Sequence, residues 1–245
     1  MASLADVRRR VADLPPEAWT AVALSTALFV YGNTASAFPH EVRDRFLLWS
    51  NLGLMAVLLA WALGLARLTV RDLGLSPRPA AGSALLGAAL SVVVAVPPVA
   101  FIGLTPLVTG DAIEVEGLSD RSGLGMAYFL AFRQPVGTAL FEEVAFRGVL
   151  YGAWHRVGGG RGALLATATT FSLWHLVIAN RTVAESGVVD HPALVAAGVL
   201  VVLAGLFVGG LCFALLRWHT GSIAAAVVAH WLIVAFMSIT VWAVA

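Results

Sequence analysis

Residues 139–148 read Ala-Leu-Phe-Glu-Glu-Val-Ala-Phe-Arg-Gly, and they place three charged side chains inside a long apolar run. Glu143 and Arg147 are four residues apart, so a helix puts them on one face within reach of an ion pair. Glu142 is turned by about 100° from Glu143 around the helix axis. We therefore expect Arg147 to neutralise Glu143, and Glu142 to point elsewhere and to be able to accept a proton.

The composition around this stretch is that of a membrane protein. Of the 245 residues, 60% are hydrophobic and 12% are charged, and the mean hydropathy is +0.89. Soluble domains carry about 25% charged residues. The composition therefore excludes a nucleic-acid binder, a disordered regulator and an ordinary cytosolic enzyme. The single cysteine, Cys212, excludes a disulfide framework, and we expect it to be a small buried apolar residue.

Apolar stretches of about 20 residues, the length that crosses a bilayer, recur along the chain. We predict an all-α fold: a polytopic transmembrane helical bundle of about seven spans that forms a single membrane domain over residues 1–245. The expected spans are 17–37, 46–68, 80–106, 124–152, 162–181, 193–217 and 220–244.

The first span admits two interpretations. Arg8-Arg9-Arg10, the apolar stretch that follows and the triplet Ala35-Ser36-Ala37 resemble a secretory signal with a cleavage site. Proline and acidic residues interrupt the basic segment, so we favour an uncleaved first helix with a cytoplasmic N-terminus.

The distribution of arginine supports this orientation. All 15 basic residues are arginine, which suggests a GC-rich bacterial genome. With a cytoplasmic N-terminus, nine arginines fall on the cytoplasmic side and four on the other, as the positive-inside rule requires. We predict an integral protein of the bacterial cytoplasmic membrane. The nine are Arg8, Arg9, Arg10, Arg67, Arg71, Arg78, Arg156, Arg161 and Arg217, and the four are Arg43, Arg45, Arg121 and Arg181.

Two histidines are expected at membrane depth, His175 in the fifth span and His230 in the seventh. Titratable groups are costly there and are typical of functional sites. Glu142 with these two histidines has the ligand types of a catalytic zinc site with an open position. The same set can activate water by general-base catalysis without a metal. The sequence leaves both alternatives open. The other histidines fall at span ends or in loops: His40, His155, His191 and His219.

Other intramembrane protease signatures are missing from the sequence. His40-Glu41 begins a zincin-like motif, but Asp44 stands where the second histidine belongs. The chain has no Gly-x-Ser-x-Gly nucleophile motif. Gly110-Asp111 lacks the preceding glycine of an aspartyl motif. Serine, aspartyl and zincin chemistry are therefore disfavoured.

Three motifs in order carry a family resemblance. Glu142-Glu143-x-x-x-Arg147, then Phe171-x-x-x-His175, then His230 resemble the CPBP (Abi) family of CAAX protease and bacteriocin-processing membrane enzymes, which includes the type II CAAX prenyl endopeptidases. The resemblance covers about residues 125–240, which would be the catalytic core.

This resemblance implies an intramembrane endopeptidase whose cavity opens toward the cytoplasmic side and whose partner is a membrane-associated peptide or protein. It implies that Glu142 is the base and His175 its partner in activating water. His230 would stabilise the oxyanion or bind a metal, and Arg147 would hold Glu143.

The chain departs from the family at one position. The third motif often reads His-x-x-x-Asn, and Val234 stands in the place of this asparagine. Valine cannot donate a hydrogen bond to an oxyanion; Asn180 and Ser238 are other donors in the chain. This departure favours a second hypothesis, a non-catalytic membrane scaffold or a bacteriocin-immunity-type binding protein with a degenerate site.

A proton-coupled transporter is a third hypothesis, since buried Glu, Arg and His also form proton relays. No inverted repeat supports it. Two further arginines need an explanation. We interpret Arg181 as a snorkelling residue at a helix end, and the sequence offers no account of Arg133.

Overall fold

The computed structural model describes residues 14–77, 80–113, 115, 117–185 and 191–245. Within these residues the chain is 85% helical and has no strand, so the all-α prediction is confirmed. Arg8-Arg9-Arg10, on which the signal-peptide interpretation depends, lie outside the described residues, as does Arg78.

The helices are numbered in the order in which they follow one another along the chain. The α-helices are α2 (Pro16–Ala37), α3 (His40–Ala60), α4 (Ala80–Thr109), α5 (Gly123–Tyr128), α6 (Phe141–Glu143), α7 (Tyr151–Trp174), α8 (Leu176–Glu185), α9 (Pro192–Thr220) and α10 (Ala224–Val244). Four segments are π-helical: η1 (Trp61–Leu65), η2 (Phe129–Arg133), η3 (Pro135–Leu140) and η4 (Val144–Leu150). The stretch around Glu142 and Arg147, expected to be a regular α-helix, is therefore largely π-helical, a form frequent at functional sites.

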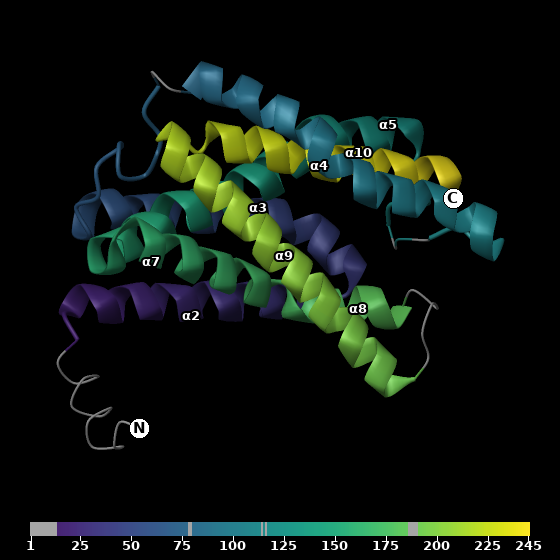
Figure 1. The fold of residues 1–245 in the computed structure, drawn as a ribbon, viewed down its shortest axis with the longest axis horizontal. Coiled ribbons are helices and arrows are strands. Elements are labelled where there is room, and N and C mark those ends of the chain that lie inside the picture. Colours follow the sequence, from purple (N-terminus) through teal and green to yellow (C-terminus); the bar gives the residue numbers. More distant parts are fainter. Residues whose placement is uncertain (1–13, 78–79, 114, 116, 186–190) are drawn as a thin grey trace.

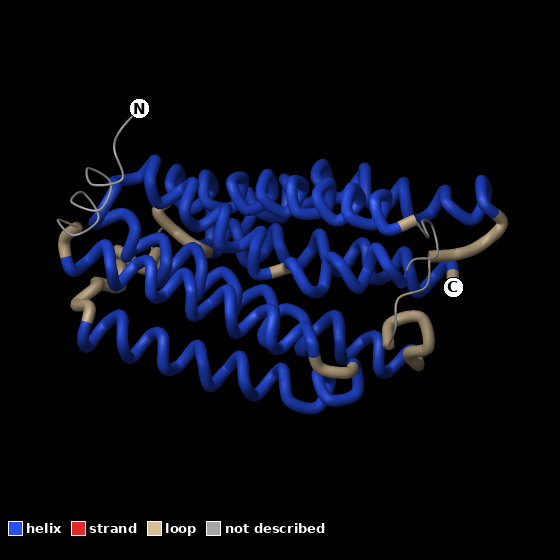
Figure 2. The backbone as a smooth tube through the Cα atoms, turned by 90° about the horizontal axis from the view of Figure 1, so that it is seen from below, coloured by secondary structure: helices blue, strands red, loops and turns tan. Residues whose placement is uncertain are grey.

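The helices pack as an elongated bundle (Figures 1 and 2). Helix α4 lies along α10, and α7 packs against both α2 and α9. Helix α9 crosses the others obliquely in Figure 1. Segments α6 and η4 contact elements from both halves of the chain, including α2, α3 and α7. The motif-bearing stretch therefore lies in the middle of the packing.

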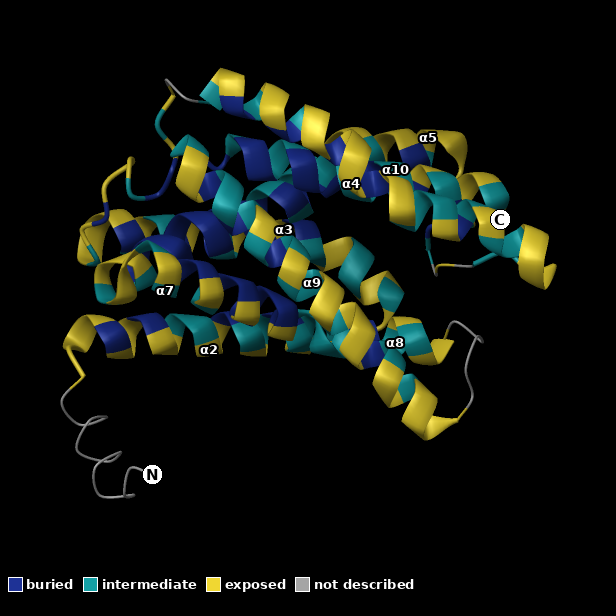
Figure 3. Cartoon of the chain, in the orientation of Figure 1, coloured by how far each residue is buried: buried dark blue, intermediate teal, exposed yellow. Residues whose placement is uncertain are grey.

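The burial pattern agrees with this central position. Every residue from Phe141 to Ala153 is buried, whereas the outer faces of the surrounding helices are exposed (Figure 3). Aromatic rings fill the space beside this stretch: Phe146 makes edge contacts with Phe171 and Trp174, with ring centroids 5.2 and 5.4 Å apart. A helix that is buried on all sides belongs at the core of the bundle.

Four stretches among the described residues are long and apolar enough to cross a bilayer: His40–Leu65, Ala80–Thr109, Pro192–Thr220 and Ala224–Val244. The bent pair Gly123–Trp174 and Leu176–Glu185 raises the number to at most five. The chain is thus an integral membrane protein, but a count of about seven spans is not confirmed. Helix α2 is not among these stretches, because Asn33 and several threonines and serines lower its mean hydropathy.

The fourth and fifth expected spans differ most from the prediction. The backbone leaves the helical conformation at Gly159 (φ 63°, ψ −168°), between the expected spans 124–152 and 162–181. The expected continuous span 162–181 is wrong, because α7 ends at Trp174 and α8 begins at Leu176 with a bend of 45°. His175 occupies the bend, with φ −94° and ψ 9°.

The expectation that Cys212 is buried is also wrong, since its side chain is exposed on α9. Few residues of α9 are buried, among them Gly210, Ala214 and Arg217. A helix that is apolar all around gives no signal for which face meets protein and which meets lipid.

Arg133, for which the sequence offers no account, and Arg181, interpreted as a snorkelling residue, both have partners in the structure. Arg133 forms an ion pair of 2.7 Å with Asp44, which also binds Arg121 at 3.0 Å. Arg181 donates to the carbonyl oxygens of Ser36 and Phe38, both at 3.1 Å, and so caps the carboxyl end of α2.

Close packing of α2 on the core gives a test. A Cβ on Gly32 would overlap the Trp174 ring, whereas a Cβ on Gly53 in α3 would meet nothing within 4 Å. We expect Gly32→Ala to lower the free energy of unfolding by roughly 1–3 kcal/mol through overpacking. The matched control, Gly53→Ala, should keep or raise it, because alanine favours helix by about 1 kcal/mol. Unfolding in mixed micelles measures both, and equal effects would contradict this packing.

Candidate active site

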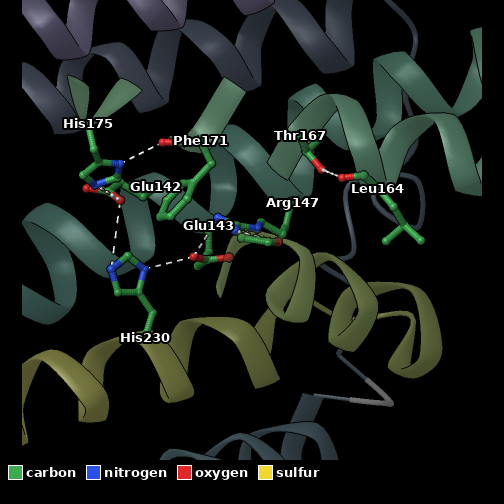
Figure 4. Close-up of polar contacts among 9 residues, drawn as sticks. Glu142, Glu143, Arg147, Leu164, Thr167, Phe171, His175 and His230 are labelled. Atoms are coloured by element: carbon green, nitrogen blue, oxygen red, sulfur yellow. Dashed lines mark hydrogen bonds and ion pairs between the residues drawn. The ribbon is translucent and has the colours of Figure 1, made fainter. Parts of the chain in front are cut away.

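Five residues expected at the site lie together in the structure, although they come from four segments (Figure 4). Glu142 and Glu143 form the end of α6, Arg147 lies in η4, His175 lies between α7 and α8, and His230 lies in α10.

Glu143 is the centre of a buried polar network. Its Oε1 atom accepts from Arg147 at 3.1 Å and from Nδ1 of His230 at 2.9 Å. The side chains of Glu143 and Arg147 are fully buried. Arg147 also donates to the Gly210 carbonyl of α9 at 3.0 Å, and its guanidinium lies 4.3 Å from the centre of the Phe171 ring. The expected Glu143–Arg147 pair is therefore present and connects η4 to α9 and α10.

Glu142 faces the two histidines from the other side. Its Oε2 atom is 3.9 Å from Nε2 of His175 and 4.0 Å from Nε2 of His230 (Figure 4). The same oxygen is buried and has no hydrogen-bond partner among the described residues. Separations of 3.9–4.0 Å are too long for direct hydrogen bonds and have the length that one water molecule bridges.

The orientation of both imidazoles is set at Nδ1. The Nδ1 atom of His175 lies 2.8 Å from the Phe171 carbonyl, which can only accept, so Nδ1 carries the proton. Neutral His175 then presents a bare Nε2 toward Glu142. His230 donates from Nδ1 to the Glu143 carboxylate and stacks on Phe213 at 5.5 Å. Both rings are thus locked with Nε2 toward one carboxylate oxygen.

Asn33, which no motif in the sequence singles out, holds the bend at His175. Its amide nitrogen donates to the Leu173 carbonyl at 2.9 Å, and its amide oxygen accepts from the Val177 backbone N–H at 2.9 Å. These two bonds satisfy backbone groups on both sides of the bend. A polar amide inside an apolar helix is a signal visible in the sequence, but its partners 140 and 144 residues away are not.

Asn51 is a second residue whose role in positioning the site is not apparent from the sequence. It donates to the Gly137 carbonyl of η3 at 2.7 Å and accepts from the Tyr31 hydroxyl at 2.6 Å. Helices α2 and α3 are thereby tied to the segment that leads into Glu142.

The other donors considered from the sequence lie elsewhere. Asn180 is exposed on α8, and Ser238 lines a cavity with Asp44 and Arg133. Neither makes a hydrogen bond to the site. Val234 follows His230 by one helical turn on α10 and has a partly exposed side chain.

The zinc alternative receives no support from the arrangement of Glu142, His175 and His230. No group of three or more His, Cys, Asp or Glu side chains suited to a metal occurs in the described part of the chain. Two ligands of a tetrahedral zinc lie about 3.3 Å apart, given bonds of about 2.0–2.1 Å. The separations of 3.9 and 4.0 Å exceed this value.

Fold and site together define an integral membrane protein with a buried carboxylate–histidine cluster. Residues 124–236 match the family model described as type II CAAX prenyl endopeptidase Rce1-like. This segment contains all three motifs, and the match supports a CPBP/CAAX protease-like family. No curated protein and no solved structure matches the chain.

The buried network predicts a strong coupling between Glu143 and Arg147. Arg147→Met leaves the carboxylate without its cation, and we expect a loss of roughly 3–5 kcal/mol in the free energy of unfolding. The double variant Glu143→Gln/Arg147→Met should lose less than the sum of the single variants. A double-mutant cycle measured by unfolding in mixed micelles checks this, with exposed Arg161→Met as a near-neutral control. Additive losses would show that the pair carries no coupling.

Proposed function

We propose that this protein is an intramembrane endopeptidase that hydrolyses a peptide bond of a membrane-associated protein or peptide. The observation that carries the proposal is the convergence of the Nε2 atoms of His175 and His230 on Oε2 of Glu142, at 3.9 and 4.0 Å. The family match supports protease activity. Residues 125–240 are then the catalytic core of a single membrane domain.

The proposed chemistry begins with a water held between Glu142 and His175. Glu142 takes a proton from this water, and the resulting hydroxide attacks the carbonyl carbon of the substrate. His175 accepts a hydrogen bond from the water at its bare Nε2 and so orients the nucleophile. The proton held by Glu142 then passes to the leaving amine as the C–N bond breaks.

His230 stabilises the negative charge that develops on the carbonyl oxygen of the substrate. Because Glu143 accepts from Nδ1, it can stabilise an imidazolium, and a protonated Nε2 donates toward the tetrahedral oxyanion. Glu143 and Arg147 then act as positioning residues through His230. The site needs water at membrane depth, and the polar cluster provides a favourable local environment for it.

A cleavage assay tests the base. Wild-type and variant proteins are reconstituted in vesicles with lipid-anchored peptides, and products are identified by mass spectrometry. Glu142→Gln keeps the shape of the side chain and should lower turnover by roughly 10²–10⁴-fold. His175→Ala and His230→Ala should show losses of similar order. Glu17→Gln and His219→Ala, at exposed positions, are the matched controls. Wild-type turnover in all three site variants would refute the mechanism.

The second candidate is a non-catalytic scaffold in which the polar cluster only fixes the helices. Val234 favours it, because an oxyanion donor common in the family is missing at this position. On the scaffold hypothesis, Glu142→Ala lowers expression or complex formation and affects no hydrolysis.

Restoring the donor separates the two candidates. Val234 is on the same helix as His230, one turn further on. Val234→Asn should raise turnover by about tenfold or more, toward the roughly 10²–10³-fold that one oxyanion donor contributes. Val234→Leu, which adds no donor, is the control. Identical turnover in the two variants would mean that this position does not face the reacting carbonyl.

A further inference from the structure

A second polar cavity lies away from Glu142, between the 66–74 turn, the start of α7 and the end of α9. Its volume is about 230 Å³. Its charged and titratable lining residues are Arg71, Asp72, Tyr151, His155, Arg156 and Arg217. Three arginines face one aspartate, so the cavity carries a net charge of +2 with His155 neutral.

Arg217 is the unusual member of this set. Its residue is only 6% exposed, although it lines the cavity. One terminal nitrogen donates to the Arg71 and Asp72 carbonyls at 3.1 and 2.9 Å. Its Nε atom is buried without a hydrogen-bond partner, and no carboxylate lies within ion-pair distance of Arg217 in the described residues. A buried cation without an anion is costly, and a bound anion would offset that cost.

The other charges leave the cavity open to an anion. Asp72 accepts from the Thr69 backbone N–H at 2.8 Å, and this bond holds the pKa of its carboxyl below the usual range. Arg156 lies 3.6 Å from Asp72 and donates to two carbonyls of the same turn. The side chain of Arg71 is exposed and makes no hydrogen bond to the described residues. Asp72 is thus already bound to Thr69 and Arg156, and Arg71 and Arg217 have no carboxylate partner among the described residues.

The location fits a lipid headgroup. The cavity lies at the end of α9, beside Trp218, and aromatic residues are enriched where helices leave the hydrocarbon. Its arginines belong to the side that the positive-inside distribution predicts to be cytoplasmic, where anionic lipids attract basic residues. Guanidinium groups bind phosphate oxygens through paired N–H donors.

We propose that this cavity is a phosphate-binding site that takes the headgroup of an anionic phospholipid. Arg217 binds the phosphate from the buried side, Arg71 closes over it from the exposed side, and the lipid tails extend along the outer face of the bundle. The occupied site holds the 66–74 turn, α7 and α9 together. The proposal is independent of the protease function.

The alternative is that Arg217 only holds the turn through the two carbonyls. A variant of Arg71 distinguishes the two explanations. Arg71 binds Arg217 through its backbone carbonyl, and its side chain takes no part in this hydrogen bond. Arg71→Gln keeps the carbonyl and removes only the charge at the cavity. Arg161→Gln removes an exposed arginine that does not line the cavity and is the charge-matched control.

The experiment measures lipid binding to the purified, delipidated full chain by native mass spectrometry. The probes are phosphatidylglycerol, phosphatidylcholine with the same acyl chains, and inorganic phosphate. We expect one phosphatidylglycerol to bind in preference to phosphatidylcholine. Arg71→Gln should weaken this binding by about fivefold, since one arginine contributes about 1 kcal/mol toward an anionic lipid. Arg161→Gln should bind like the wild type.

Each other outcome is also decisive. Binding of inorganic phosphate with the affinity of phosphatidylglycerol, and with the same loss in Arg71→Gln, would support a phosphate site and overturn the lipid as its source. Equal binding of the two lipids, or equal affinity in Arg71→Gln and Arg161→Gln, would overturn the site itself.

Discussion

The structure depends on one buried carboxylate, Glu143, which is shared between Arg147 and His230 at 3.1 and 2.9 Å. Burying each of these groups separately in the centre of an apolar bundle would cost free energy, and the bonds to Oε1 of Glu143 offset part of that cost. Arg147 extends the network to the Gly210 carbonyl. One ion pair therefore fixes η4 against α9 and α10 and sets the direction of the His230 ring. The geometry around Glu142 follows from it.

The N-terminal helices, which lie outside the family match, complete this geometry. Asn33 of α2 binds backbone groups on both sides of the bend at His175, and Asn51 of α3 binds the Gly137 carbonyl. The 66–74 turn packs against Gly148, next to Arg147. The matched segment 124–236 thus supplies Glu142 and the two histidines, and the preceding helices hold two of its irregular regions in place.

The sequence predicts interactions within one helix better than interactions between helices. The sequence predicts the Glu143–Arg147 ion pair because the two residues are four positions apart. The pair also forms in the largely π-helical stretch that replaces the expected α-helix. His175 and His230 were candidates because histidine is rare at membrane depth, but no spacing rule gives their common orientation toward Glu142. The partner of Arg133 is Asp44, 89 positions earlier, and only packing brings them together. The buried position expected for Cys212 is wrong because the sequence of a uniformly apolar helix does not show which face packs against protein.

In the proposed mechanism, a water polarised by Glu142 attacks the peptide carbonyl directly. A single-turnover cleavage by the wild-type protein in ¹⁸O-labelled water, with hydroxylamine present, tests it. Direct attack by water puts one ¹⁸O atom in the new carboxyl terminus of the product and forms no peptide hydroxamate. Formation of the hydroxamate would reveal an acyl-enzyme intermediate and contradict direct attack by water.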